Sequence, residues 1–385
     1  MIKNISAITA SSYLSMLFLG VAATLIGAAA RNIGLTPYEI GLMITFQNLG
    51  FMISVMISGA LADSHEKPRI LLMGSLILSA AFLSFYLTQI FNVNLFIMFM
   101  IGVGIGTYEG VTDAMLIDIH PQKESLHINI NHFFVTFGSI LITVYLIFLQ
   151  MDWRNAVTQS GILVLFLALI FGLTKLAAKK APTEPYLERM RVLTRDKVVI
   201  AFFIATALVV GVEAGTIGIL TTYLMDLRDF TQVTSKLGLV VFLVGMALGR
   251  LIMGYISPRE KINQILLTLF GASVVIYSAL YFIDLSVITY GVIFLAGLSI
   301  SALLPLMLTQ AGLLYKEIAG TVLGSIKVAI PLGGILIPFL MSTLFRYSSL
   351  RASLIIFPLS FLLAFVLIYL TSYSKSKLQG STAVD

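Results

Sequence analysis

The sequence has no cysteine and few charged residues for its length. Its 385 residues include 24 Lys and Arg and 18 Asp and Glu, so only 11% are charged, where soluble globular proteins usually have about 25%. The lack of cysteine excludes disulfides, thiolate metal sites and cysteine nucleophiles. The shortage of charge argues against a soluble enzyme, a nucleic-acid-binding protein and a disordered chain. It indicates that most of the surface contacts the lipid bilayer.

Catalytic and nucleotide-binding motifs are also absent. There are four histidines, and only His132 lies within an apolar run. No HExxH, GxSxG or GxxxxGK[ST] motif occurs, and no repeated selectivity element of a channel is visible. We therefore expect no enzyme activity, no catalytic residues, no metal site and no cofactor. The net charge of +6 does not imply nucleic acid, because the basic residues lie in short loops.

What the sequence has in abundance is long apolar runs. A helix needs about 20 residues to cross the hydrocarbon core, and runs of this kind are too long and too continuous for β-barrel strands. They predict an all-α membrane protein with twelve transmembrane helices. The predicted spans are 6–30, 39–61, 70–90, 95–117, 128–149, 156–174, 198–222, 236–256, 263–283, 288–314, 321–344 and 352–371.

The basic residues between the spans predict the orientation. With the N-terminus inside, 16 of the 24 Lys and Arg residues fall in inside loops. Because basic residues favour the cytoplasmic side, we expect a multi-pass protein of the cytoplasmic (inner) membrane with both termini cytoplasmic.

The longest polar stretch divides the chain into two halves. It covers 175–197 and predicts a cytoplasmic linker between an N-terminal bundle, 1–174, and a C-terminal bundle, 198–385. The halves resemble each other, because a glycine followed nine residues later by Pro-Arg occurs in both, 190 residues apart. Such paired halves are common in transporters, with the binding site at their interface.

The repeated segment carries a family resemblance. GALADSHEKPR at 59–69 and GRLIMGYISPREK at 249–261 resemble the two signature loops of the major facilitator superfamily. The resemblance implies two pseudo-symmetric six-helix bundles, alternating access and a monomer. It also implies gating residues, namely Gly59, Asp63, Arg69, Gly249 and Arg250. Glu66 departs from the signature, which usually has Gly there.

Asp63 has a physical interpretation of its own. A carboxylate at a helix end accepts hydrogen bonds from a neighbouring helix N-terminus or pairs with an arginine, and such a contact would latch one conformational state. The alternative is a loop of solvated charges that only sets the topology.

Few ionisable residues lie inside the predicted spans, and such residues usually serve function. Glu109 and Asp113 are four residues apart and so share a helix face. Two carboxylates this close in low dielectric do not both ionise easily, which suits a proton carrier. Glu213 and Lys327 are the other central charges. A structural alternative pairs Glu213 with Lys327, and Asp113 with Arg or His.

A finer resemblance surrounds Glu109. The helix containing Gly104, Gly106, Glu109 and Pro121, the start of the next helix at Asn131-His132, and Gly211-Val212-Glu213 are similar to the fucose/glucose:proton symporter branch. The branch implies that Glu109 is a protonatable or sugar-binding carboxylate and that Glu213 binds substrate. Asp113 departs from its usual Asn, and Lys327 is not part of the pattern.

Together these features predict proton-coupled symport of a small polar solute, most simply a sugar. The alternatives are a carrier of an organic acid, which Lys327 and His132 would recognise, and an efflux antiporter. The segment 128–149 lacks the Gly-Pro motif of such antiporters. The expected proton-coupling residues are Glu109 and Asp113. The expected substrate-binding residues are Glu213, Lys327, His132, Asn131, Gln47, Tyr108 and Gln310.

Overall fold

The protein is described from a computed structural model, which covers residues 4–35, 37–148, 152–176, 185–285 and 288–381. Within these residues the secondary structure is helical throughout, with no strand. Twelve helical segments are long and apolar enough to cross a membrane, which confirms the predicted all-α fold.

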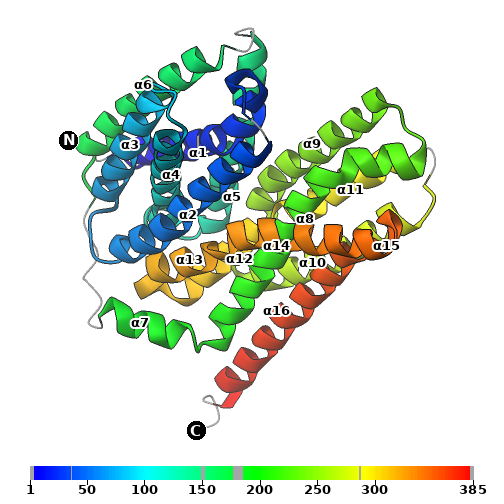
Figure 1. Cartoon of the computed structure of the whole chain (residues 1–385). Helices are drawn as coiled ribbons and strands as arrows, with labels where there is room; N and C mark the ends of the chain where they lie inside the picture. The colour runs from blue at the N-terminus through cyan, green and yellow to red at the C-terminus, as the bar shows by residue number, and fades with distance from the viewer. Residues whose placement is uncertain (1–3, 36, 149–151, 177–184, 286–287, 382–385) are drawn as a thin grey trace. The chain divides into compact units, whose positions relative to one another are not determined.

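The first part of the chain forms six long helices and one short one (Figure 1). They are α1 (Ile5–Ile33), α2 (Pro37–Ala62), α3 (Lys67–Ser84), α4 (Phe91–Ile119), α5 (Glu124–Phe148), α6 (Trp153–Leu173) and α7 (Tyr186–Leu193). The remaining helices are α8 (Lys197–Arg228), α9 (Gln232–Ile256), η1 (Arg259–Lys261), α10 (Ile262–Phe282), α11 (Thr289–Ser301), α12 (Leu303–Leu314), η3 (Lys316–Ile318), α13 (Ala319–Lys327), α14 (Ala329–Tyr347), α15 (Leu350–Ser353) and α16 (Ile356–Ser381).

Proline explains the division of two predicted spans into two helices each. The span 288–314 is interrupted at Ala302, three residues before Pro305, and the span 321–344 is interrupted at Val328, three residues before Pro331. A proline cannot donate a hydrogen bond to the residue four positions earlier, and its ring clashes with that carbonyl. Ala302 and Val328 each directly follow the residue whose carbonyl the proline leaves without its helical hydrogen bond.

The chain forms two compact units that do not coincide with simple sequence halves. The first contains Met1–Arg189 and Gly312–Val328, and the second contains Met190–Ala311 and Ala329–Asp385. Helix α13 therefore belongs to the first unit, where it packs against α2 and α4. The bundles 1–174 and 198–385 remain a prediction from the sequence.

Glycines allow the helices of the first unit to approach closely. A Cβ on Gly102 of α4 would lie 2.0 Å from the backbone oxygen of Gln47 on α2. A Cβ on Gly138 of α5 would lie 2.0 Å from the backbone oxygen of Leu17 on α1. Because only glycine fits at these crossings, α2 packs directly on α4 and α1 packs directly on α5.

Glycines also allow the helices of the second unit to approach closely. Its main helix pairs are α9 with α11, α8 with α14 and α10 with α16. A Cβ on Gly297 of α11 would lie 2.1 Å from the backbone oxygen of Phe242 on α9. A Cβ on Gly333 of α14 would lie 2.0 Å from that of Ala207 on α8.

Candidate functional site

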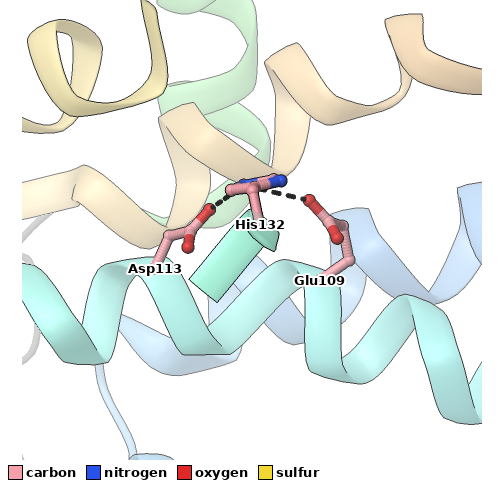
Figure 2. A group of neighbouring side chains, drawn as sticks. All are labelled: Glu109, Asp113 and His132. Carbon is pink, nitrogen blue, oxygen red and sulfur yellow. Dashed lines mark hydrogen bonds and ion pairs between the residues drawn. The ribbon is translucent and has the colours of Figure 1, made fainter. Parts of the chain in front are cut away.

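A buried ionic cluster lies within the first unit. Glu109 and Asp113 project from one face of α4, His132 comes from α5, and Lys327 is the last residue of α13. Figure 2 shows the His132 ring between the two carboxylates. Its Nε2 atom lies 3.1 Å from Asp113 Oδ2 and 4.0 Å from Glu109 Oε1. The spacing of four residues on α4 thus places both carboxylates beside one imidazole.

Lys327 is the cation of this cluster. Its side chain is fully buried, and its ammonium donates hydrogen bonds to Asp113 Oδ2 at 2.6 Å and to the backbone oxygen of Glu109 at 2.5 Å. Glu109 Oε1 also lies 2.9 Å from it. A buried charge requires both a counter-charge and hydrogen bonds, and Lys327 has both. Within the first unit Lys327 thus pairs with Asp113 and Glu109.

The two carboxylates differ in their hydrogen-bond and ionic partners. Asp113 accepts a hydrogen bond from Asn131 Nδ2 at 2.8 Å on one oxygen, and contacts Lys327 and His132 through the other. Glu109 Oε1 is buried and lies 2.9 Å from the Lys327 ammonium and 4.0 Å from His132 Nε2. Hydrogen bonds to a carboxylate favour its charged form. Asp113 is the carboxylate with the larger number of such bonds.

The cluster also has the donor atoms of a cation site. One atom each from Glu109, Asp113 and His132 lies within 4.8 Å of the other two. The Lys327 ammonium contacts both carboxylates, so the protein supplies its own cation to the same oxygens. For that reason we assign no metal to this position.

Of the other substrate-binding residues predicted in the first unit, one belongs to the ionic cluster and two lie outside it. Asn131 belongs to the cluster through its bond to Asp113. The Tyr108 hydroxyl donates to Ser75 Oγ at 2.7 Å, between α4 and α3. Gln47 Nε2 donates to the backbone oxygen of Ala22 at 3.0 Å, between α2 and α1. Tyr108 and Gln47 therefore bond within helix-packing contacts.

The second unit contains the remaining predicted residues. Arg250 of α9 lies 3.4 Å from Glu213 Oε1 of α8 and also donates to the backbone oxygen of Ser301. The Glu213 side chain is 20% exposed, whereas that of Arg250 is 5% exposed. Gln310 Nε2 of α12 donates to Asn263 Oδ1 of α10 at 3.1 Å. Arg250, expected as a gating residue, is thus the ionic partner of the expected substrate residue Glu213.

A second polar site in the first unit surrounds Asp63, one residue after α2. Its carboxylate accepts hydrogen bonds from the backbone amides of Gly320 at 2.7 Å and Thr321 at 2.8 Å, and from the Thr321 hydroxyl. These amides are the unpaired donors of the N-terminus of α13. Burial raises the pKa of the Asp63 carboxyl, while the bonds from Thr321 and Gly320 act in the opposite direction.

An arginine completes the contact, and it comes from the polar linker. Arg189 of α7 donates to Asp63 Oδ2 at 3.1 Å and to Thr321 Oγ1 at 2.8 Å, and is buried. Arg69 is 75% exposed and pairs with Glu66 at 2.7 Å. The sequence analysis missed Arg189 because it lies in the polar linker. The available signal was the short helical segment after Pro185.

The two predicted gating glycines lie at close helix crossings. A Cβ on Gly59 of α2 would lie 2.5 Å from the backbone oxygen of Gly320, so α2 and α13 touch through their backbones beside Asp63. A Cβ on Gly249 of α9 would lie 2.2 Å from Ser301 Oγ. Each position thus excludes a larger residue.

Comparisons with known proteins agree with this architecture. A sequence model described as Major Facilitator Superfamily matches residues 6–336. The glucose/mannose transporter GlcP of Bacillus subtilis (strain 168) is 23% identical over 334 residues, covering 80% of this chain and 79% of that protein. The Escherichia coli fucose:proton symporter FucP superposes with a TM-score of 0.78 at 16% identity, over 94% of this chain and 98% of FucP. The human organic anion transporter MFSD10 (TETRAN) gives 0.75 at 13% identity, over 95% and 100%.

Proposed function

Because the chain belongs to the major facilitator superfamily, we propose that this membrane transporter moves a sugar-like small solute together with protons. As a member of that family it is a carrier of small molecules and not an enzyme. Two of its relatives, GlcP and FucP, are named for the transport of sugars, and FucP is named as a proton symporter. These names support a sugar substrate for this chain.

The observation that supports proton coupling is the net charge of the cluster. Glu109 and Asp113 bring two negative charges and Lys327 brings one positive charge, so a neutral His132 leaves one negative charge in excess. An uncompensated buried charge is strongly unfavourable. One proton removes it. A carrier that reorients with a neutral cluster must therefore bind one proton in each cycle.

Glu109 is the proposed proton acceptor. Asp113 is engaged by Asn131, Lys327 and His132, whereas the Glu109 carboxylate has the Lys327 ammonium at 2.9 Å as its close partner. Asp113 then influences the proton affinity of Glu109, because both carboxylates contact the ammonium of Lys327. Glu213 is the proposed substrate contact, because it is the more exposed member of its ion pair.

An organic acid is the second candidate substrate. MFSD10 is named as an organic anion transporter, and Lys327 and His132 are cationic or can become so. However, Lys327 already donates to Asp113 and Glu109, so a carboxylate substrate would have to displace one of these bonds. This competition favours an uncharged solute. An efflux antiporter has no comparable support.

The proposal places the protein in the cytoplasmic membrane as a monomer, with both termini cytoplasmic. The excess of basic residues in the loops on that side supports this orientation.

Uptake into proteoliposomes tests the proposal. We would impose a pH gradient and measure accumulation of labelled D-glucose, D-mannose and L-fucose. The variant Glu109→Gln keeps the shape of the side chain and removes its proton exchange, so we expect it to lose accumulation but to keep exchange of solute in the absence of a gradient. Glu260→Gln is the matched control, because Glu260 is exposed on η1. Gradient-driven accumulation by Glu109→Gln at the wild-type level would refute the coupling role.

A further inference from the structure

Two histidines outside the ionic cluster form a stacked pair at the α4–α5 end of the first unit. His120 caps the C-terminus of α4 and His127 lies in the first turn of α5. Their ring centroids are 3.5 Å apart with an interplanar angle of 15°. Helix α1 holds both rings, since Thr9 Oγ1 lies 2.6 Å from His120 Nε2 and the Tyr13 hydroxyl lies 2.6 Å from His127 Nδ1.

The hydrogen bonds determine which nitrogen of the neutral His120 ring carries the proton. Thr9 donates its only hydroxyl proton to the backbone oxygen of Ile5 at 2.8 Å, so it must accept from His120 Nε2. The neutral His120 ring then carries its proton on Nε2, and Nδ1 is its basic nitrogen. Burial and the nearby charge of Lys123 lower the pKa of His120. The lowered pKa favours the neutral form of this ring.

The stacking limits the pair to one proton. Two imidazolium rings face to face would repel each other strongly, because like charges at this separation disfavour each other. Lys123 adds a further positive charge beside them. The pair can thus accept a proton on one ring and must release it before the next arrives, which is how a relay group behaves.

The same two helices lead from this pair to the ionic cluster. Ser12 follows Thr9 by less than one turn of α1 and donates to Asn131 Oδ1 at 3.2 Å. Asn131 stands one turn after His127 on α5 and donates to Asp113 Oδ1 at 2.8 Å. The Ser12–Asn131 pair thus lies one helical turn, a rise of about 5.4 Å, beyond the Tyr13–His127 pair on α5. Polar side chains between α1 and α5 therefore run from the stacked histidines toward Asp113.

We propose that His120 and His127 relay protons between the α4–α5 end of the first unit and the Glu109–Asp113 cluster. This inference rests on the proposed proton coupling. In the release direction, Glu109 gives up its proton and becomes a carboxylate, and a neutral imidazole of the pair accepts that proton and becomes an imidazolium. The imidazolium then transfers the proton to water at the helix ends and returns to the neutral form. The charged and titratable groups around the pair are Lys123 and Tyr13.

Variants that keep the hydrogen bonds but cannot carry a proton provide the test. His120 bonds through Nε2, which a glutamine amide imitates, and His127 bonds through Nδ1, which an asparagine amide imitates. We would compare His120→Gln/His127→Asn with Thr9→Val/Tyr13→Phe, which removes the hydroxyls and keeps both titratable rings. The readout is sugar-driven proton flux into proteoliposomes that contain a pH-sensitive dye, with the three sugars above as probes and solute exchange as the measure of folded carrier.

A relay predicts that His120→Gln/His127→Asn slows proton flux by about 100-fold with exchange preserved, and that Thr9→Val/Tyr13→Phe has the smaller effect on flux. Wild-type proton flux in His120→Gln/His127→Asn, or a larger loss of flux in Thr9→Val/Tyr13→Phe, would overturn the relay. Loss of exchange together with flux in His120→Gln/His127→Asn would overturn it in favour of a structural role. If the wild-type protein exchanges the sugars without moving protons, the proposed coupling itself fails, and the relay with it.

Discussion

Replacing Lys327 with methionine tests the charge balance of the buried cluster. Methionine keeps a long apolar side chain at this fully buried position and removes the ammonium. Glu109 and Asp113, which lie 2.9 and 2.6 Å from that ammonium, then share the site without a lysine to balance their charge. Removing one partner of a buried ion pair destabilises a protein by about 3–5 kcal/mol. We expect a loss of this size at pH 8.

The loss should depend on pH in one direction. Protonation of a carboxylate removes a negative charge that the Lys327→Met cluster can no longer balance. The folded variant therefore binds this proton more tightly than the unfolded chain does, and its stability should increase as the pH falls. Since one pH unit corresponds to about 1.4 kcal/mol, recovery should extend over about 2–4 pH units.

Thermal unfolding in detergent provides the assay. At about 2 °C per kcal/mol, the Tm of Lys327→Met should lie about 6–10 °C below that of the wild type at pH 8 and approach it at pH 5. The double variant Lys327→Met/Asp113→Asn removes one charge of each sign, so it should regain much of the lost stability. Lys236→Met is the matched control, because Lys236 is exposed on α9. A Lys327→Met protein with wild-type Tm at both pH values would refute the charge balance.

Two further predictions concern the first unit. Arg189→Ala should weaken the contact between Asp63 and α13 by about 1.5–3 kcal/mol, the strength of a hydrogen bond to a charged group. Spin labels on His65→Cys and Glu317→Cys, unique sites because the chain has no cysteine, should then report a longer distance, and an unchanged distance distribution would contradict the latch. Tyr108→Phe should lower stability by about 1 kcal/mol and leave sugar affinity unchanged, since its hydroxyl bonds to Ser75. A clear loss of affinity in a binding assay would place it at the substrate.

The sequence predicts the features that depend on local pattern. Each membrane span follows from a continuous apolar run, and twelve are present. The shared face of Glu109 and Asp113 follows from helical periodicity. The close helix crossings at Gly59 and Gly249 follow from small residues at positions where a side chain would collide with the neighbouring helix.

The partners of these residues depend on packing and are not local. Lys327 bonds to Asp113 across 214 residues of sequence, and Arg189 bonds to Asp63 across 126. No periodicity within one helix specifies which helix lies beside it. Family resemblance also gave no guidance for Lys327, which lies outside the branch pattern. The assignment of α13 to the first unit likewise follows from its contacts with α2 and α4 and not from its place in the chain.

Helix α13 is held at both ends, and this arrangement links the charge of the cluster to movement in the proposed mechanism. Asp63 binds the first turn of α13 through Gly320 and Thr321, and the carboxylates of α4 bind its last residue, Lys327. The chain then breaks at Val328, before Pro331, and enters the second unit at Ala329. A proton on Glu109 removes one of the two carboxylate charges that hold Lys327. In the proposed mechanism the Asp63 contact remains, so α13 would leave α2 and α4 only when the cluster is protonated and the latch also opens. Proton binding would then be required for the movement without causing it alone.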